Sequence, residues 1–393
     1  MATAPPPRDR AEADGRRGAD AGLGESTSVA LLRVAPALTH AVPWAVLGRW
    51  PTPIEPAAAA VSAAAGGEVW IKREDLAHPW YGGNKLRTLE LLLAAAHADG
   101  ARRIWSTGGY GSNHALATAI HAPRLGLEAG AMLFPQPAEP AAQRNLRALA
   151  STGATVVAMA SPLRLPWVMR RHRRQHPDDR VMPPGGASPR GALGAVSAML
   201  ELADQVAAGL CPRPRQVVVP AGSTTTAAGL LAGAALAARL GAWPHPPLVR
   251  AVAISPWPIT EAWRIARLAA AALAELVGPL GPVAAIPTSA LRRGLVVDHG
   301  YLGAGYGHPT GAAAWARAVF ARAAGAHQPP LPELDPVYTA KTAACVLDVA
   351  GHAGPTLFWL TRSSARLPPD DEAAIARLPA PMRTWLGLGA GVT

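Results

Sequence analysis

Short apolar runs alternate with longer segments of helical periodicity from Val69 onward. The expected strands are 103–106, 129–134, 155–159, 217–219, 249–254 and 356–360. One helix is expected to begin near Asn113, and further helices are expected over 141–151, 192–208, 259–276, 312–324 and 339–350. Strands that alternate with helices in this way are typical of a parallel sheet wrapped by helices. The pattern therefore predicts an α/β fold.

The composition is that of a globular protein with a large buried core. Hydrophobic residues make up 50% of the 393 positions and charged residues only 16%, which favours roughly two or three domain-sized units. Residues 1–32 are rich in Pro, Ala, Arg and Asp, and we expect them to form a disordered tail. Charged or helix-breaking residues interrupt every apolar stretch before it reaches ~18 residues, so no membrane segment is expected.

Charge and cysteine content argue against several functional classes. The net charge of +11 is spread along the chain, and its one local run, 170–174, is interpreted as a solvated helix face. No aromatic residues interleave that run, so no nucleic-acid partner is predicted. Cys211 and Cys345 are too few and too far apart for a disulfide framework, which fits a reducing cytoplasm. The 12 histidines show no metal-ligand spacing, so no metal site is predicted.

Lysine is rare in this chain. Of the 37 basic residues only Lys72, Lys85 and Lys341 are lysines, and an amine, unlike a guanidinium, can lose its proton and attack a carbonyl. Lys85 has the best setting, because Gly-Gly-Asn at 82–84 allows close approach of a planar ligand and a helix cap. A helix N-terminus would also lower the pKa of its amine. The alternative is an ordinary exposed lysine in a first helical turn.

Two further segments place polar groups at the start of a helix. In 108–114 (GGYGSNH) a strand turns into a helix, so that free backbone N–H groups and the Ser112 hydroxyl suit a carboxylate. In 217–230 a strand runs into AGSTTT, where Gly222, Ser223, Thr225 and Thr226 are predicted to bind a phosphate group. The alternatives are an ordinary Ser-Asn helix cap and a threonine-capped core helix.

A glycine-flanked tyrosine is the fourth candidate. Residues 303–310 (GAGYGHPT) can present the phenol of Tyr306 into a cleft. The alternative is a tyrosine that packs at a domain edge. The glycines follow no clear strand, so a dinucleotide-binding fingerprint is not predicted.

These motifs resemble, in order, those of the 1-aminocyclopropane-1-carboxylate deaminase and D-cysteine desulfhydrase family, pyridoxal-phosphate enzymes of the tryptophan-synthase-beta fold type. The matching segments are 50–55 (WPTPIE), 72–75 (KRED), 82–85 (GGNK), 108–114, 185–194, 221–230, 305–310 and 335–339 (DPVYT). The resemblance implies a large domain of 33–87 and 183–393 with a small domain, 88–182, inserted and the ligand between them. It also implies a homodimer.

The resemblance assigns roles to the candidate residues. Lys85 would hold pyridoxal phosphate as a Schiff base and then act as the general base. Asn113 would bond the ring oxygen, and Ser112 would hold the substrate carboxylate or assist proton transfer. Tyr306 would be an acid, base or orienting residue, and Thr361 would face the pyridine nitrogen. The segment 222–226 would bind the phosphate.

The reaction implied is the release of ammonia and a 2-oxo acid from a small amino acid. Two alternatives stay open, namely β-replacement or racemisation by an enzyme of the same fold, and a binding or regulatory protein that has lost catalysis. Metal catalysis has no support in the sequence.

The chain also departs from the family pattern. Gly111 stands where Gln is usual, Thr88 where a basic residue is usual, and Thr224 and Thr225 where glycines are usual. The family's His-Thr-Gly-Gly is 360–363 (LTRS) in this chain.

Further changes concern charge and aromatic residues. Arg362 adds a charge that could answer an anionic substrate group, and no tyrosine near Leu280 matches a second active-site tyrosine of the family. Lys72 and Lys341 are interpreted as structural, with Lys72 paired to Glu74 or Asp75.

Overall fold

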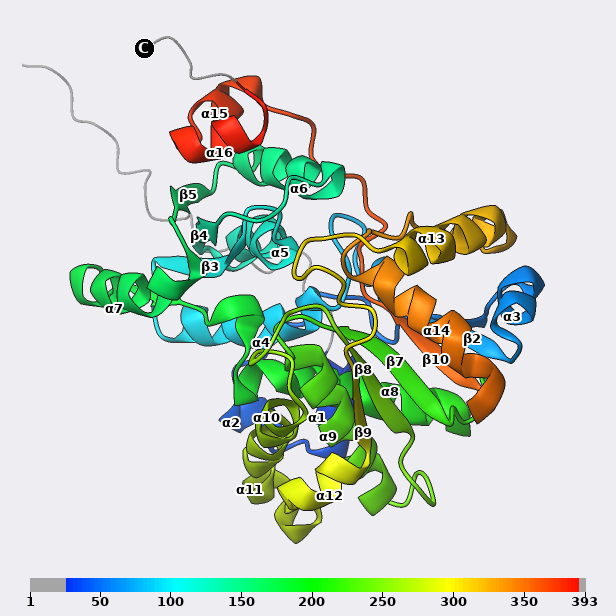
Figure 1. Ribbon diagram of the computed structural model, residues 1–393. Coiled ribbons are helices and arrows are strands. Elements are labelled where there is room, and N and C mark those ends of the chain that lie inside the picture. Colours follow the sequence, from blue (N-terminus) through cyan, green and yellow to red (C-terminus); the bar gives the residue numbers. More distant parts are fainter. Residues whose placement is uncertain (1–25, 389–393) are drawn as a thin grey trace, which may run out of the picture.

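The structure, a computed structural model, describes residues 26–388 and contains two separate β-sheets (Figure 1). The larger sheet has the strand order β1 (Ile54–Pro56), β2 (Val69–Arg73), β10 (Thr356–Leu360), β7 (Gln216–Ala221), β8 (Leu248–Ala253) and β9 (Leu295–Asp298). All neighbours are parallel except the edge pair β1 and β2. The smaller sheet is parallel throughout, with the order β5 (Thr155–Ala158), β4 (Glu128–Phe134), β3 (Arg103–Gly109) and β6 (Asp179–Val181).

Helices cover both faces of each sheet. They are α1 (Ala30–Val34), α2 (Leu38–Ala41), α3 (Ala59–Ala65), α4 (Lys85–Ala98), α5 (Asn113–His121), α6 (Pro140–Ser151), α7 (Leu165–Gln175), α8 (Pro189–Ala207), α9 (Thr225–Arg239), α10 (Ala262–Ala274), α11 (Val277–Leu280), α12 (Thr288–Arg293), α13 (Gly311–Ala323), α14 (Thr339–Ala353), α15 (Glu372–Ala376) and α16 (Ala380–Trp385). The predicted α/β fold, with parallel sheets wrapped by helices, is confirmed.

The strand β10 shows why both faces of the larger sheet need cover. Leu357 and Trp359 pack into the core beneath α8, α9 and α10, whereas Phe358 and Leu360 pack into a second core beneath α3, α13 and α14. Side chains alternate between the two faces of a strand, so a strand covered on both sides is apolar at every position. The run TLFWL is accordingly buried throughout.

The chain termini do not follow the predicted domain boundaries. Part of the expected tail, 1–25, lies outside the described residues, but Ala30–Val34 forms α1, and Leu31 is fully buried with its N–H 3.1 Å from Oγ of Ser197. That part of the tail prediction is wrong. At the other end, α15 and α16 pack on α6, beside the smaller sheet, although the prediction grouped them with the larger one (Figure 1).

No single helix within 26–388 has both the length and the apolar composition of a membrane span. One bent pair, α10 with the segment Val277–Ala284, meets both requirements when its two parts are taken together.

Candidate active site

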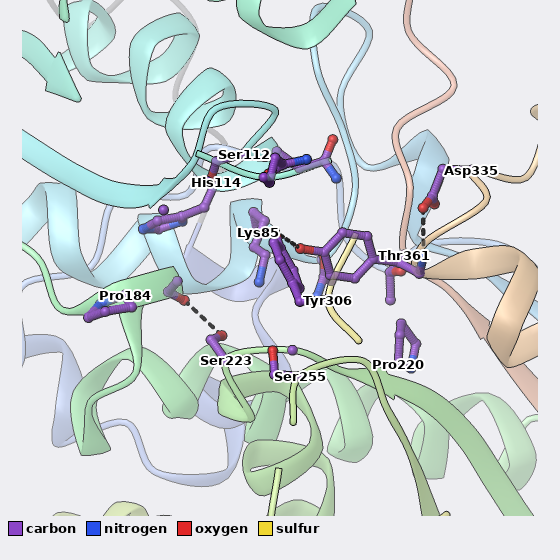
Figure 2. A pocket seen from close by; sticks show the side chains of 18 of the residues that line it. Lys85, Ser112, His114, Pro184, Pro220, Ser223, Ser255, Tyr306, Asp335 and Thr361 are labelled. Carbon is purple, nitrogen blue, oxygen red and sulfur yellow. Dashed lines mark hydrogen bonds between the residues drawn. The ribbon is translucent and has the colours of Figure 1, made fainter. Parts of the chain in front are cut away.

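The carboxyl ends of strands from both sheets meet at one cavity of about 410 Å³, which is where open α/β sheets bind their ligands. Of the residues proposed from the sequence, Lys85, Ser112, Asn113, Gly222, Ser223, Thr226, Tyr306 and Thr361 line this cavity. Thr225 is the exception, because it is buried outside the lining. Figure 2 shows Lys85 central in the group, with Ser112 and Ser223 on opposite sides of it.

Lys85 is the first residue of α4, and no described residue forms a hydrogen bond or ion pair with its amine. Burial lowers the pKa of Lys85 to about 8, so far more of the amine is neutral near pH 8 than in an exposed lysine. A Cβ added at Gly185 would lie 3.8 Å from Nζ, which places the loop between β6 and α8 close to the amine. The fold therefore holds the Lys85 amine without a protein partner and with a lowered pKa.

The two glycines before Lys85 lie close to other parts of the backbone. A Cβ at Gly82 would lie 2.5 Å from the carbonyl oxygen of Asp75. A Cβ at Gly83, where φ is 92°, would lie 2.6 Å from the carbonyl oxygen of Thr361. The glycines thus allow this segment to pack closely against the protein's own backbone, and Gly82 also lines the cavity.

A buried ionic network anchors α4 beneath the amine. Arg87 donates to both carboxylate oxygens of Glu74 at 2.7 Å and to Glu201 at 3.0 Å, and its guanidinium lies 3.7 Å from the centre of the Trp50 ring. Lys72 donates to Glu201 at 2.5 Å, so its predicted pairing with the acidic residues that follow it in the chain is wrong. All these charged side chains are at most 4% exposed. The helix position is fixed by groups that satisfy one another.

Ser112 and Asn113 occupy the start of α5, as predicted. Ser112 Oγ accepts from the backbone N–H of Ala115 at 3.2 Å, so the residue is also an ordinary helix cap. Asn113 Oδ1 accepts from the hydroxyl of Tyr81 at 3.0 Å and from Nδ2 of Asn145 at 2.8 Å. Because both neighbours donate to its oxygen, the NH₂ group of Asn113 is left to donate to a ligand.

The start of α9 places several hydroxyl groups together. The hydroxyls of Ser223 and Thr225 lie 3.2 Å apart, and each lies 3.4 Å from the carbonyl oxygen of Gly185. Thr226 Oγ1 accepts from Nδ2 of Asn84 at 2.8 Å, so Asn84 joins α4 to α9 instead of capping α4. Free N–H groups at the start of a 15-residue helix favour an anion here.

Thr224, where the family resemblance implies glycine, lines the cavity in place of Thr225. Its φ is 71°, and no other non-glycine residue between 26 and 388 has a positive φ. A β-branched side chain disfavours this left-handed conformation. The turn into α9 therefore keeps the backbone shape of a glycine turn with a threonine in it.

Two tyrosine side chains meet in the cavity lining. The hydroxyls of Tyr306 and Tyr338 lie 2.7 Å apart, and both residues line the cavity. Burial raises the pKa of both phenols, so both are protonated near neutral pH. Asp335 accepts from the N–H of Tyr338 at 2.6 Å and fixes the start of α14. The family resemblance implies a second tyrosine upstream of Tyr306, which this chain lacks near Leu280, whereas Tyr338 follows Tyr306 in the chain.

The changed segment 360–363 forms one edge of the cavity. Thr361 is 8% exposed, and no described residue forms a hydrogen bond with its hydroxyl. The Arg362 guanidinium donates through one nitrogen to the carbonyl oxygen of Glu333 at 2.6 Å. Ser363 Oγ accepts from the N–H of Gly82 at 2.9 Å, which closes the segment onto the lysine motif.

His114 is a cavity residue that the sequence analysis quoted but gave no role. It is 2% exposed, and neither ring nitrogen has a hydrogen-bond partner within the described residues. Burial, aided by the positive charge of Lys85, lowers the pKa of His114 to about 3, so the ring is neutral. Figure 2 shows it on the side of Lys85 away from Tyr306. Its signal in the sequence was its place directly after Ser112 and Asn113.

The groups that line the cavity fit the pyridoxal phosphate that the resemblance implies. The partnerless amine of Lys85 suits an aldehyde, and the NH₂ group of Asn113 suits a ring oxygen. The amides and hydroxyls before and within the first turn of α9 suit a phosphate. The free hydroxyl of Thr361 suits a ring nitrogen.

Comparison with known proteins agrees with this chemistry. Residues 46–325 match the family described as pyridoxal-phosphate dependent enzyme. The chain is 36% identical over 307 residues to a nocardicin C-9' epimerase of Nocardia uniformis, which covers 75% of this chain and 86% of that protein. It is 38% identical over 194 residues to a D-cysteine desulfhydrase of Salmonella choleraesuis, which covers 47% of this chain and 57% of that protein.

Solved structures show the same relationship. A structure described as that of an ACC deaminase homologue superposes with a TM-score of 0.67 at 29% identity and covers 83% of this chain and 93% of that chain. The serine racemase of maize superposes with a TM-score of 0.51 at 16% identity and covers 86% of this chain and 95% of that chain, which supports the fold alone.

Proposed function

Because this chain belongs to the family of pyridoxal-phosphate-dependent enzymes, we propose that it is a lyase or deaminase that converts a small amino acid to a 2-oxo acid and ammonia. Its cofactor is pyridoxal phosphate. The observation that carries the proposal is the Lys85 amine, which has no partner among the described residues and whose pKa is lowered to about 8. It faces a cavity that also holds two protonated phenols.

Each residue has one task in this proposal. The cofactor, when bound, withdraws electron density from the substrate's α carbon. Lys85 removes a proton from the substrate, and the start of α5 with Ser112 binds the substrate carboxylate. Tyr306, kept protonated by burial and bonded to Tyr338, donates a proton to the group that leaves or to carbon. The hydroxyls around the start of α9 hold the phosphate.

The first test is the visible absorbance of the purified protein with pyridoxal phosphate. We expect a band from the lysine-bound cofactor in the parent protein and its loss in Lys85→Ala. Lys85→Arg is the matched variant, because it keeps the positive charge but cannot form the covalent bond. A band that survives in both variants would contradict the assignment of Lys85.

Amino-acid turnover is the second test. Small D- and L-amino acids are added to the loaded protein, and 2-oxo acid and ammonia are measured in equal amounts. Binding of amino acids without any product would instead favour a protein that has kept the cofactor and lost catalysis.

Inversion at the α carbon is a second candidate function. The epimerase of Nocardia uniformis matches over 86% of its length, whereas the desulfhydrase matches over 57%. The cavity offers Lys85 and Tyr306 as two separate groups able to exchange a proton, which inversion requires. In deuterated water, inversion would give the opposite enantiomer with deuterium at the α carbon and no 2-oxo acid.

The homodimer and the cytoplasmic location remain proposals that rest on the family resemblance and on the two unpaired cysteines. Light scattering during size-exclusion chromatography would settle the first, since a monomer of 40.5 kDa is easily separated from a dimer. Fractionation of the source cells would test the second.

A further inference from the structure

Gln136 lines the cavity in the loop that follows β4, and neither the motifs nor the assigned roles involve it. The loop lies between two glycine sites. A Cβ at Gly109 would lie 2.1 Å from Oε1 of Gln136, and a Cβ at Gly307 would lie 2.7 Å from Cδ of Pro137. The loop is therefore packed between the end of β3 and the segment that bears Tyr306. The same added Cβ at Gly109 would lie 3.4 Å from Cε1 of Tyr306, so the Gln136 side chain and the Tyr306 ring both lie beside Gly109.

The backbone of this loop is fixed from outside the cavity. Nε1 of Trp385, on α16, donates to the carbonyl oxygen of Gln136 at 2.6 Å. Gln143, on α6, donates to the carbonyl oxygen of Trp385 at 3.2 Å, and the Tyr110 ring meets the Trp385 ring edge-on at 5.5 Å between centres. Proline on either side of Gln136 restricts the loop further. The position of Gln136 is thus set before any ligand binds.

The side chain of Gln136, in contrast, has no partner. Its Oε1 is buried without a hydrogen bond, and no described residue bonds its NH₂ group. Turning the amide over would bury the unpaired NH₂ group instead, so either orientation leaves a polar atom unsatisfied. An unsatisfied buried polar atom destabilises a fold. Because Oε1 lies against Gly109, the NH₂ group is the end of the amide that can bond to a molecule in the cavity, and the backbone that carries it is held in place.

The surroundings indicate what this amide binds. Its chain neighbours in the cavity lining, Phe134, Pro135 and Pro137, are apolar. Of the charged residues that line the cavity, Asp335 accepts from the start of α14 and Arg362 donates through one nitrogen to a backbone carbonyl. An amide NH₂ group in such a wall favours a substrate group that accepts a hydrogen bond over an apolar group of the same size.

We propose that Gln136 determines substrate specificity by hydrogen bonding to a neutral polar side chain, a hydroxyl or an amide, of the amino-acid substrate. This inference rests on the proposed function, because it assumes that an amino acid enters the cavity.

The experiment compares amino acids of equal size and different polarity on the loaded protein. Asparagine is paired with leucine, and serine with 2-aminobutyrate, each as both enantiomers. Dissociation constants are taken from the change in cofactor absorbance on titration, so the readout does not depend on turnover. We expect the parent to bind the polar member of at least one pair about tenfold or more tightly, and Gln136→Leu to lose that preference.

Two further variants make the test decisive. Gln175→Leu changes an exposed glutamine at the end of α7, outside the cavity lining, and should keep the preference of the parent. Gln136→Met, unbranched and of similar length, replaces Gln136→Leu if that variant fails to retain the cofactor band. Amino acids that bind without a polar preference, or a preference that persists in the apolar variants, would overturn this inference alone. A cofactor band that no amino acid alters would overturn the proposed function as well.

Discussion

Two groups of polar side chains lie near the start of α4, and they differ in how their hydrogen bonds are satisfied. In the first group, the buried Arg87 pairs with the buried Glu74 and Glu201. In the second group, which lines the cavity, the Lys85 amine and both nitrogens of His114 have no partner among the described residues. The paired groups hold the helix in position, whereas the unpaired groups lie at the cavity without a protein partner.

The largest effect should come from breaking the paired group. Arg87→Met leaves two buried carboxylates without their main partner, and we expect the free energy of unfolding to fall by about 3–5 kcal/mol. Urea denaturation of the cofactor-free protein measures this. Arg147→Met is the control, because Arg147 pairs with Asp370 and Glu372 at the surface and should cost at most ~1 kcal/mol. Equal losses in the two variants would show that the buried network does not hold α4.

The next effect concerns the unpaired amine and its pKa of about 8. Only neutral amine attacks the cofactor, so the rate at which the visible band forms should rise with pH and level off above about pH 8. Between pH 6 and pH 8 the neutral fraction increases on the order of fiftyfold. Stopped-flow absorbance measures this rate. A rate that still rises through pH 10 would mean that burial does not shift the pKa of Lys85.

A smaller effect is expected at Thr224, which lies in the cavity wall but has a strained backbone rather than an unpaired side chain. Glycine tolerates the φ of 71°, so Thr224→Gly should raise the free energy of unfolding by up to about 1 kcal/mol. Thr225→Gly should lower it by about 1 kcal/mol or more, because Thr225 is buried in the helix itself. Thermal unfolding of the two variants should therefore shift in opposite directions.

The smallest effect on stability is expected at His114, which belongs to the group without hydrogen-bond partners. His114→Leu removes two unpaired ring nitrogens from a buried position, and we expect the free energy of unfolding to change by less than about 1 kcal/mol in either direction. The same urea titration used for Arg87→Met measures it. A loss comparable to that of Arg87→Met would reveal that the ring is structurally essential, and the distinction between the two groups would fail.

Much of this organisation could be predicted from the sequence, and the exceptions have physical causes. The strands buried on both faces, such as 356–360, were found because they are continuously apolar. The edge strands β6 and β9 were missed, since Asp179–Val181 and Leu295–Asp298 are short and owe their conformation to pairing with β3 and β8.

The site shows the same division. The residues of local motifs, Lys85 among them, were proposed from the sequence and line one cavity. Tyr338 was given no role although it lies in the quoted segment 335–339, just before α14, and Gln136 was not proposed because it lies in the loop after β4, outside every motif. Gly82 and Gly83 were placed against a ligand, although the backbone they meet lies in distant parts of the chain or in the preceding turn. Contacts of this kind have no local signature.

The path of the C-terminal segment has a mechanical consequence. The chain passes between the two sheets along α4, returns before α8, and crosses again after β10 to reach α15 on the smaller sheet (Figure 1). Two bodies joined by two links can swing about the line between them, whereas a third link away from that line restrains the swing. The third link here starts at the cavity edge, at 361–363, and leads to Trp385, whose indole N–H donates to the backbone carbonyl of Gln136. Any movement of the two sheets apart would therefore act on both of these walls of the cavity through one connection.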